Sequence, residues 1–331
     1  MRKRATAQEV AEAAGVSKWT VIRAFKPGAS ITPASREKVL DAARSLRYSP
    51  NLLARSLATN LTHQIAVFVD DFANPHKLPF LERLTSMAQA EGLVVMLINI
   101  NTHFDHIHAL INTDQRQVDA VVLFGTSFRD ETLRDKRLGP GFPQLFVLAR
   151  DSQIKDVPAI TCDTEIAMRE ICDYLRDKGY RRPAFMAGPR ALSTALGRRR
   201  YFKDYWARQG APELVELQAE RYSAQAGAEA IRRYLSAAPA AGRIDLIMCE
   251  NDILACGAKT AVCHEFGLQV PNDIAIVGFD NIELAADPAY DLTTYEQPTD
   301  AMVRATIDMI LGRRVRETIN LPGKFISRGS A

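Results

Sequence analysis

The chain of 331 residues contains no run of about 18 apolar residues, the length that a membrane-spanning helix requires. Its first ten residues, MRKRATAQEV, are basic but lack the apolar stretch of a secretory signal, so we expect a cytoplasmic protein. The five cysteines are odd in number and lack the spacing of a disulfide framework, which fits a reducing compartment.

Several kinds of catalytic chemistry also lack their motifs. There is no glycine-rich phosphate loop, and no nucleophilic serine stands at a strand-turn-helix elbow. His103, His106 and His108 stand near Asp105, but a structural zinc site needs four converging ligands, and no second cluster supplies the rest. We therefore expect no metal, no cofactor and no enzymatic activity.

Positive charge is concentrated at the N-terminal end. Residues 1–62 hold 11 Lys or Arg against 4 Asp or Glu, whereas the whole chain holds 42 against 39. Such a basic segment is typical of a domain that binds nucleic-acid phosphates. The alternative is a solvated basic face without a partner.

The same segment has the pattern of a helix-turn-helix. Thr6 and Glu9 form a capping box at the start of a first helix, which Gly15 ends. Ser17 then caps a second helix over residues 18–25. Two short helices joined by such a turn place the second one in the DNA major groove.

A third helix and a short connector follow. Thr32-Pro33 opens the third helix, whose core-facing side we predict from its spacing to consist of Val39, Ala42, Ala43 and Leu46. A hinge helix is predicted over residues 52–57, with Leu52, Leu53 and Leu57 apolar. These leucines either pack on the three preceding helices, or pair between two copies and wedge into the DNA minor groove.

The remainder alternates short apolar runs with amphipathic stretches, which predicts parallel sheets with crossover helices. The pattern starts again after residue 163 and gives two α/β lobes of similar layout, with a cleft between the carboxyl ends of their strands. The predicted strands cover residues 64–70, 93–100, 120–124, 144–148, 184–187, 246–249 and 274–277. The predicted helices cover residues 81–90, 106–115, 165–178, 201–209, 224–236 and 252–266.

Three stretches, EVAEAAGVSKWTVIRAF, TPASREKVLDAARSLRYSPNLLARSL and ENDILACGAKTAVCHEFGLQVPNDIAIVGFDN, resemble the LacI/GalR family of bacterial transcription regulators. The resemblance implies a small all-α headpiece (1–49), a hinge helix and linker (50–62), and a two-lobed core like that of periplasmic binding proteins (63–331). Within that core, the N-lobe would comprise about 63–161 and 296–322. The C-lobe would comprise about 163–294 and 324–331.

The resemblance also implies a DNA-binding surface. Lys18, Trp19 and Arg23 would face base edges, Ser17 and Thr20 would lie near phosphates, and Leu57 would be the minor-groove wedge beside Ala54. The full set of expected DNA contacts is Thr6, Ser17, Lys18, Trp19, Thr20, Arg23, Asn51, Ala54, Arg55 and Leu57. The chain departs from the family at Ile22, where Ser is usual, and at Lys26, where Asn is usual, so its operator sequence does not follow from other members.

Eight residues are expected to bind an effector in the cleft by the same resemblance: Asn74, Lys77, Arg150, Thr194, Arg198, Tyr222, Asn251 and Asp280. Arg198 is placed in the loop after the strand at 184–187, and Asn251 is assigned to the ligand while Asp252 caps the next helix. Asp280 could instead be a helix cap, Tyr222 an ordinary half-buried side chain, and Lys77 a solvent-facing cation. Sugar-binding members often carry Asp-Arg where this chain has Ala149-Arg150.

These features predict a DNA-binding transcription regulator, a repressor, whose operator binding responds to a small molecule. If Lys77, Arg150 and Arg198 all point into the cleft, they favour a sugar acid or sugar phosphate; otherwise the site is an ordinary sugar site. Without C-terminal leucine heptads we expect a homodimer on a pseudo-palindromic operator. The alternatives are a solute-binding protein without a DNA role and a carbohydrate-acting enzyme.

Overall fold

The computed structural model describes residues 5–25, 28–49, 61–101, 105–128, 130–139, 141–152, 154–190, 196–239 and 242–331. The chain divides into two compact units, Met1–Thr62 and His63–Ala331. The first unit contains the headpiece, and we call the second unit the core. The hinge residues expected to touch DNA, namely Asn51, Ala54, Arg55 and Leu57, lie outside the described residues, as do Lys26, His103 and Thr194.

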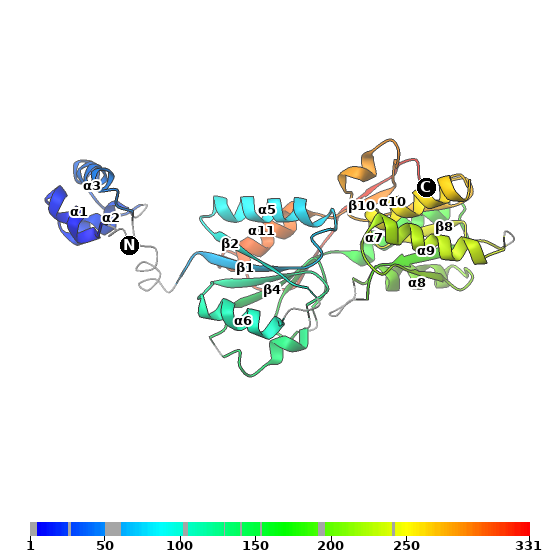
Figure 1. The fold of residues 1–331 in the computed structure, drawn as a ribbon, viewed down its shortest axis with the longest axis horizontal. Coiled ribbons are helices and arrows are strands. Elements are labelled where there is room, and N and C mark those ends of the chain that lie inside the picture. The colour runs from blue at the N-terminus through cyan, green and yellow to red at the C-terminus, as the bar shows by residue number, and fades with distance from the viewer. Residues whose placement is uncertain are drawn as a thin grey trace. The chain divides into compact units, whose positions relative to one another are not determined.

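The headpiece contains three helices, α1 (Ala7–Ala14), α2 (Lys18–Ala24) and α3 (Pro33–Ser45) (Figure 1). The predicted capping box is present, because the Thr6 backbone N–H donates to Glu9 Oε2 at 2.7 Å and the Glu9 N–H donates to Thr6 Oγ1 at 3.3 Å. Gly15 ends α1 with a φ of 64°, a conformation that glycine adopts without steric cost. The predicted helix-turn-helix is therefore confirmed.

A small apolar core holds these helices together. Val10, Val21 and Val39, one from each helix, have no exposed surface. The prediction that Leu46 joins them is wrong, since its side chain is 38% exposed. The helix ends at Ser45, and Tyr48 instead turns back onto the headpiece core, where its ring meets Phe25 edge-on.

In the core, the N-lobe is built on a six-stranded parallel sheet in the order β11-β5-β4-β3-β1-β2. Helices α5 and α11 cover one face of this sheet and α6 covers the other (Figure 1). The strands are β1 (Gln64–Val69), β2 (Val94–Asn99), β3 (Ala120–Phe124), β4 (Gln144–Leu148), β5 (Ala159–Cys162) and β11 (Ile319–Leu321). The helices are α5 (Lys77–Ala90), α6 (His106–Gln115) and α11 (Thr299–Ile310).

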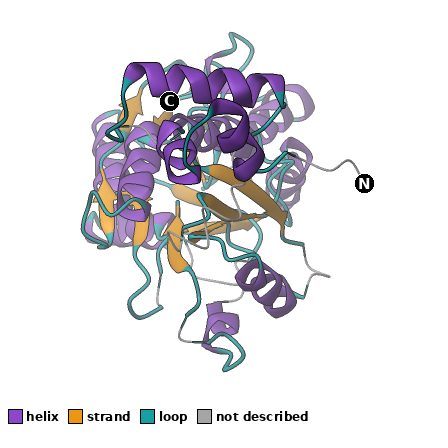
Figure 2. Cartoon of the chain, turned by 90° about the vertical axis from the view of Figure 1, so that its left-hand side faces the viewer, coloured by secondary structure: helices purple, strands orange, loops and turns teal. Residues whose placement is uncertain are grey.

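The C-lobe has a four-stranded parallel sheet in the order β7-β6-β8-β9, again with helices on both faces. Figure 2 colours the helices of the chain purple and its strands orange. The strands are β6 (Pro183–Ala187), β7 (Val215–Gln218), β8 (Leu246–Cys249) and β9 (Ala275–Val277), and β10 (Thr294–Glu296) pairs with β12 (Lys324–Ile326). The helices are α7 (Thr164–Asp177), α8 (Arg198–Arg208), α9 (Ala224–Ala237) and α10 (Asp252–Thr260), which continues as a π-helical turn over Ala261–Glu265.

The predicted fold class, a helix-turn-helix followed by a two-lobed α/β core with parallel sheets, is confirmed. The chain passes between the lobes after β5, between β10 and α11, and between β11 and β12. No helix in the described part of the chain is long and apolar enough to cross a membrane.

Candidate functional site

A cavity of about 220 Å³ lies between the lobes of the core. Seven of the eight expected effector residues line it, namely Asn74, Lys77, Arg150, Arg198, Tyr222, Asn251 and Asp280. They come together because they follow or begin the elements that meet at the carboxyl edges of the two sheets. The cavity is smaller than the ~300–1,000 Å³ of typical drug-sized sites, which indicates a small occupant.

Lys77, the first residue of α5, is buried on the N-lobe side. Its Nζ lies 3.0 Å from Asp70 Oδ1, 3.3 Å from the carbonyl oxygen of Phe124, and 3.9 Å from the centre of the Phe124 ring. The alternative that Lys77 faces solvent is therefore wrong. Burial raises the pKa of Asp70, but the Lys77 charge and the hydrogen bonds from Ser127 and Lys77 outweigh it and hold that pKa below its usual value.

The Asp70 carboxylate also requires a glycine opposite it. A Cβ at Gly125, whose φ is +150°, would stand 2.1 Å from Asp70 Oδ1. Gly125 therefore permits the close approach of β3 to the ion pair.

Arg150 is 1% exposed and is held by oxygen atoms on several sides. Its Nη2 and Nη1 lie 2.7 and 3.1 Å from the two carboxylate oxygens of Asp130, and its Nε donates to the Gly125 carbonyl at 2.8 Å. The bidentate pair fixes the guanidinium plane. Arg150 lines the cavity with its charge compensated.

Arg198 is the first residue of α8, not part of the preceding loop, because the helix starts three residues earlier than the apolar pattern predicts. Its Nη1 donates to the Glu250 carbonyl, its Nη2 lies 3.6 Å from Asp280 Oδ1, and its guanidinium stacks 3.7 Å from the centre of the Phe279 ring. Asp280 caps none of the described helices and instead faces Arg198. The alternative that Asp280 is a helix cap is therefore wrong.

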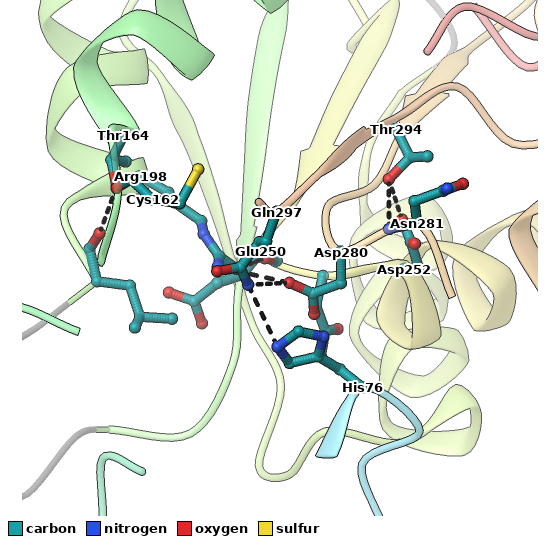
Figure 3. Close-up of polar contacts among 12 residues, drawn as sticks. His76, Cys162, Thr164, Arg198, Glu250, Asp252, Asp280, Asn281, Thr294 and Gln297 are labelled. Atoms are coloured by element: carbon teal, nitrogen blue, oxygen red, sulfur yellow. Dashed lines mark hydrogen bonds and ion pairs between the residues drawn. The ribbon is translucent and has the colours of Figure 1, made fainter. Parts of the chain in front are cut away.

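Gln297 was not among the expected residues. Its Nε2 donates to Asp280 Oδ1 at 2.7 Å and lies 3.4 Å from His76 Nε2, so it stands between a C-lobe carboxylate and an N-lobe ring (Figure 3). Burial and the charges of Lys77 and Arg198 lower the pKa of His76, although Asp280 opposes them, so the site favours the neutral ring.

The roles of Asn251 and Asp252 are the reverse of those expected for the helix cap. Asn251 is the N-cap of α10, and its Oδ1 accepts from the Leu254 N–H at 3.2 Å. Asp252 is fully buried and accepts from Thr294 Oγ1 at 2.6 Å and the Ile282 N–H at 2.9 Å. Because the cap uses the Asn251 oxygen, its amide nitrogen is the group left for a ligand.

Tyr222 also lines the cavity. Its hydroxyl donates to Glu250 Oε2 at 2.9 Å, and the same oxygen accepts from the Gly188 N–H at 2.6 Å. Burial and the Glu250 charge raise the pKa of Tyr222 well above its usual value. A Cβ at Gly188 would stand 2.1 Å from the Tyr222 ring, so glycine is required there.

Asp71, another residue that sequence reasoning missed, contributes a buried acceptor. It lines the cavity with a φ of 47°, and its Oδ2 is buried with no hydrogen-bond partner among the described residues. Burial and the neighbouring charge of Asp70 raise the pKa of Asp71. An unsatisfied buried acceptor is costly unless a ligand or water donates to it.

The three cations of the cavity that the sequence singled out are therefore each paired with a carboxylate. Each of the three cations expected to attract an anion has a carboxylate at 2.7 to 3.6 Å: Lys77 has Asp70, Arg150 has Asp130 and Arg198 has Asp280. All three cations line the cavity, as the prediction of a sugar acid or sugar phosphate requires, but each is paired with a carboxylate, which weakens its attraction for an anion.

The histidine cluster is not assembled as a metal site in the part of the chain that the structure describes, where no group of three or more potential ligands converges. Asp105 instead caps α6 by accepting from the Ile107 and His108 N–H groups, each at 3.1 Å. The buried ring of His106 stacks on Phe128 with 5.1 Å between centroids.

The headpiece carries its own candidate surface. Ser17, Lys18, Trp19 and Arg23 are exposed on or beside α2, while Thr20 is half-buried. Ser17 caps the helix and Thr6 caps α1, so both hydroxyls also have a local structural role. The predicted DNA contacts of these residues stay predictions.

Comparisons with known proteins match both units. Residues 6–51 match bacterial regulatory proteins of the lacI family, and residues 172–331 match a periplasmic binding protein-like domain. The ribose operon repressor of Escherichia coli K12 is 29% identical over 340 residues, which cover 99% of this chain and 100% of the repressor. Catabolite control protein A of Priestia megaterium is 27% identical, with 95% of this chain and 94% of the relative covered.

Among solved structures, the lac repressor dimer bound to operator and the anti-inducer ONPF superimposes with a TM-score of 0.85 at 24% identity, covering 99% of both chains. A helix-turn-helix headpiece joined to a two-lobed core with a cavity between its lobes defines a DNA-binding transcription regulator. The chain carries a domain of the lacI family of bacterial regulatory proteins, followed by a periplasmic binding protein-like domain, and over its whole length it is similar to repressors. The named relatives are regulators and not enzymes.

Proposed function

We propose that this protein is a repressor whose operator binding is controlled by a small polyhydroxylated effector in the cavity of the core. The observation that carries the proposal is the convergence of Arg198, Asp280, Asn251 and Arg150 on one small cavity in a chain that also has the headpiece. Effector and operator would then change each other's affinity by the same factor. A solute-binding protein would need only the core, and an enzyme would turn its ligand over.

For the DNA, the proposal keeps the full set of expected contacts. Lys18, Trp19 and Arg23 are exposed on α2, as base contacts require, while the hinge contacts at Asn51, Ala54, Arg55 and Leu57 lie outside the described residues. A DNA-binding role also places the protein in the cytoplasm. The boundaries 1–49, 50–62 and 63–331, and the lobe limits within the core, stay part of the proposal.

For the effector, a neutral sugar fits better than an anion. Asp280 and the unpartnered Oδ2 of Asp71 can accept from hydroxyls, while Arg198 and the Asn251 amide can donate to them. Phe124, Leu148 and Tyr222 add apolar surface for the C–H face of a sugar ring. Sugar-binding members often carry an Asp where this chain has Ala149. We propose that Asp71 supplies a carboxylate to the ligand in its place.

The test is calorimetry of the full-length protein with neutral sugars and with the matching sugar acids and sugar phosphates. We expect a neutral sugar to bind at least about tenfold more tightly than its anionic partner, because an added anion would meet cations whose charge is already compensated by carboxylates. The same sugar must change the fraction of operator DNA that the protein binds in a gel shift. Tighter binding of the anion would contradict the effector class, and turnover of the sugar would contradict the regulatory role.

We further propose a homodimer on a pseudo-palindromic operator. The strand β2 ends the order of the N-lobe sheet, and its Val94 and Leu97 are 62% and 46% exposed, while Leu78 on neighbouring α5 is 60% exposed. Exposed apolar side chains at a sheet edge are suited to cover by a second copy. Light scattering at micromolar concentration should give twice the chain mass, and Leu97→Glu should shift the mass toward one chain. A tetramer, or a monomer in the wild type, would refute the prediction.

A further inference from the structure

Helix α2 exposes two large apolar side chains. Trp19 is 69% exposed and Ile22 is 45% exposed, whereas Val21 and Ala24 of the same helix are buried in the headpiece core. Residues three apart lie on the same helical face, so Trp19 and Ile22 form one apolar patch opposite the buried side. Nothing in the described headpiece covers this patch.

The charged neighbours of the patch point to nucleic acid as its occupant. Lys18 is four residues before Ile22, and Arg23 is four residues after Trp19, so each apolar side chain has an exposed cation about one turn away. The hydroxyls at the start of the helix are engaged with each other, because Ser17 Oγ lies 2.9 Å from Thr20 Oγ1 and accepts from the Thr20 N–H at 3.1 Å. The face therefore offers two cations and an apolar patch but little neutral hydrogen-bonding capacity.

Only one base-pair edge in the major groove suits such a patch. Thymine presents its 5-methyl group there, whereas guanine presents two acceptors, cytosine an amino donor, and adenine an acceptor and a donor. Ile22 has no hydrogen-bonding group, so covering a polar base edge with it would remove that edge from water without replacing its partner. Trp19 has a single donor at Nε1 and is otherwise apolar.

We propose that Trp19 and Ile22 read thymine 5-methyl groups, so that the preferred half-site carries T·A pairs facing α2. The inference rests on the proposed DNA-binding function and adds the base chemistry that the helix selects. Arg23 and Lys18 would add polar or phosphate contacts around these thymines.

The experiment uses the full-length protein and removes single methyl groups. An operator is first selected from random duplexes, and each thymidine is then replaced by deoxyuridine, which differs from it only by lacking the 5-methyl group. We expect about fourfold weaker binding for each contacted methyl that is removed, as the transfer of one methyl group from water predicts. Deoxyuridine outside the half-sites is the matched DNA control and should change nothing.

The protein variants assign the methyl groups to side chains. In Ile22→Ser, replacing thymidine by deoxyuridine at one position should no longer weaken binding, because the side chain that contacts that methyl group is absent. In Trp19→Ala, the same should hold at another position. Arg23→Ala should weaken binding yet keep both penalties. Since Ile22 and Trp19 are exposed, thermal melting of the variants should match the wild type.

The possible results distinguish a failure of the thymine inference from a failure of the proposed repressor function. If the protein selects a sequence but all deoxyuridine operators bind as tightly as the thymidine one, the thymine inference is overturned and the repressor function stands. If no sequence is selected over random DNA, both are overturned.

Discussion

Replacing Asp280 by asparagine should shift the effector response to roughly 10- to 100-fold higher effector concentration while leaving operator binding intact. The Asp280 carboxylate is buried at the cavity, accepts from Gln297 Nε2 at 2.7 Å and lies 3.6 Å from Arg198 Nη2. Asparagine keeps the size but loses the charge, so Arg198 is left without its carboxylate and a ligand hydroxyl loses a charged acceptor. Because hydrogen bonds to charged groups contribute about 1.5–3 kcal/mol, effector affinity should fall roughly 10- to 100-fold.

The backbone should tolerate this change. Asp280 has a φ of 107° and Asn281 follows with a φ of 51°, a turn in which asparagine is among the least strained side chains. Calorimetry measures the effector affinity, and gel shift measures operator affinity with and without effector. Since the coupling is reciprocal, at effector concentrations that saturate the wild type but leave the variant largely unoccupied, the variant must show nearly the same operator affinity with and without effector.

Asp300→Asn provides the matched control. Asp300 is 3.1 Å from Arg83, but both side chains are more than half exposed and neither lines the effector cavity. The same chemical change there should leave effector affinity and response unaltered. An Asp280→Asn protein that still binds effector like the wild type would remove Asp280 from the site.

The parts of the fold that sequence predicted best are those whose apolar pattern is long. Strand β3 (Ala120–Phe124) is buried along its whole length, and helix α6 begins at a side-chain cap, so their limits agree with the predicted ranges. Strands β5 and β7 have only four residues each, and β7 alternates exposed and buried positions. Length alone does not explain the omission, because β8 also has four residues and its limits were predicted; β7 has only one buried position, and partners far along the chain determine the pairing of such strands.

The candidate site divides in the same way. Asp280 was predicted because it closely follows a strand at the carboxyl edge of a sheet, where open α/β lobes bind ligands, whereas Arg198 was predicted from the family resemblance. The assignment of the helix cap to Asp252 failed because asparagine and aspartate are equally good helix caps, and only the burial of Asp252 decides between them. Gln297 carries no sequence signal, since its role depends on the approach of His76 from the other lobe.

Lys77 is the clearest case of an environment that sequence did not reveal. A lysine at the start of a helix is usually solvated, and its partner Asp70 stands seven residues earlier, across the loop between β1 and α5. Nothing in the sequence indicates that Asp70 and Lys77 are partners. The fold brings their charges within 3.0 Å of each other in a buried site.

The last prediction therefore concerns this ion pair. Lys77→Met should lower the free energy of unfolding by about 3–5 kcal/mol, because it leaves the buried Asp70 carboxylate without its cation. Methionine can still fill the volume beside Phe124, so the loss should reflect charge more than packing. Urea unfolding of the full-length protein, followed by circular dichroism, measures the change.

The double variant Asp70→Asn/Lys77→Met separates these contributions. Asparagine retains an oxygen to accept from the Ser127 N–H, which now donates to Asp70 Oδ2 at 2.7 Å, but it carries no charge. The double variant should therefore recover much of the stability lost in Lys77→Met, since replacing both members of a buried pair is often nearly neutral. A double variant no more stable than Lys77→Met would show that packing, and not charge, is what Lys77 supplies.

Acid titration gives an independent check with a defined sign. The pKa of folded Asp70 is lowered from its usual value, so the pair contributes stability above the unfolded pKa of about 4, and this contribution is lost as the pH falls through the lower, folded value. The wild type should therefore lose stability below about pH 4 more steeply than the double variant, which has no carboxylate at this position. Equal slopes for the two proteins would mean that Asp70 and Lys77 do not interact in the folded state, however close they lie.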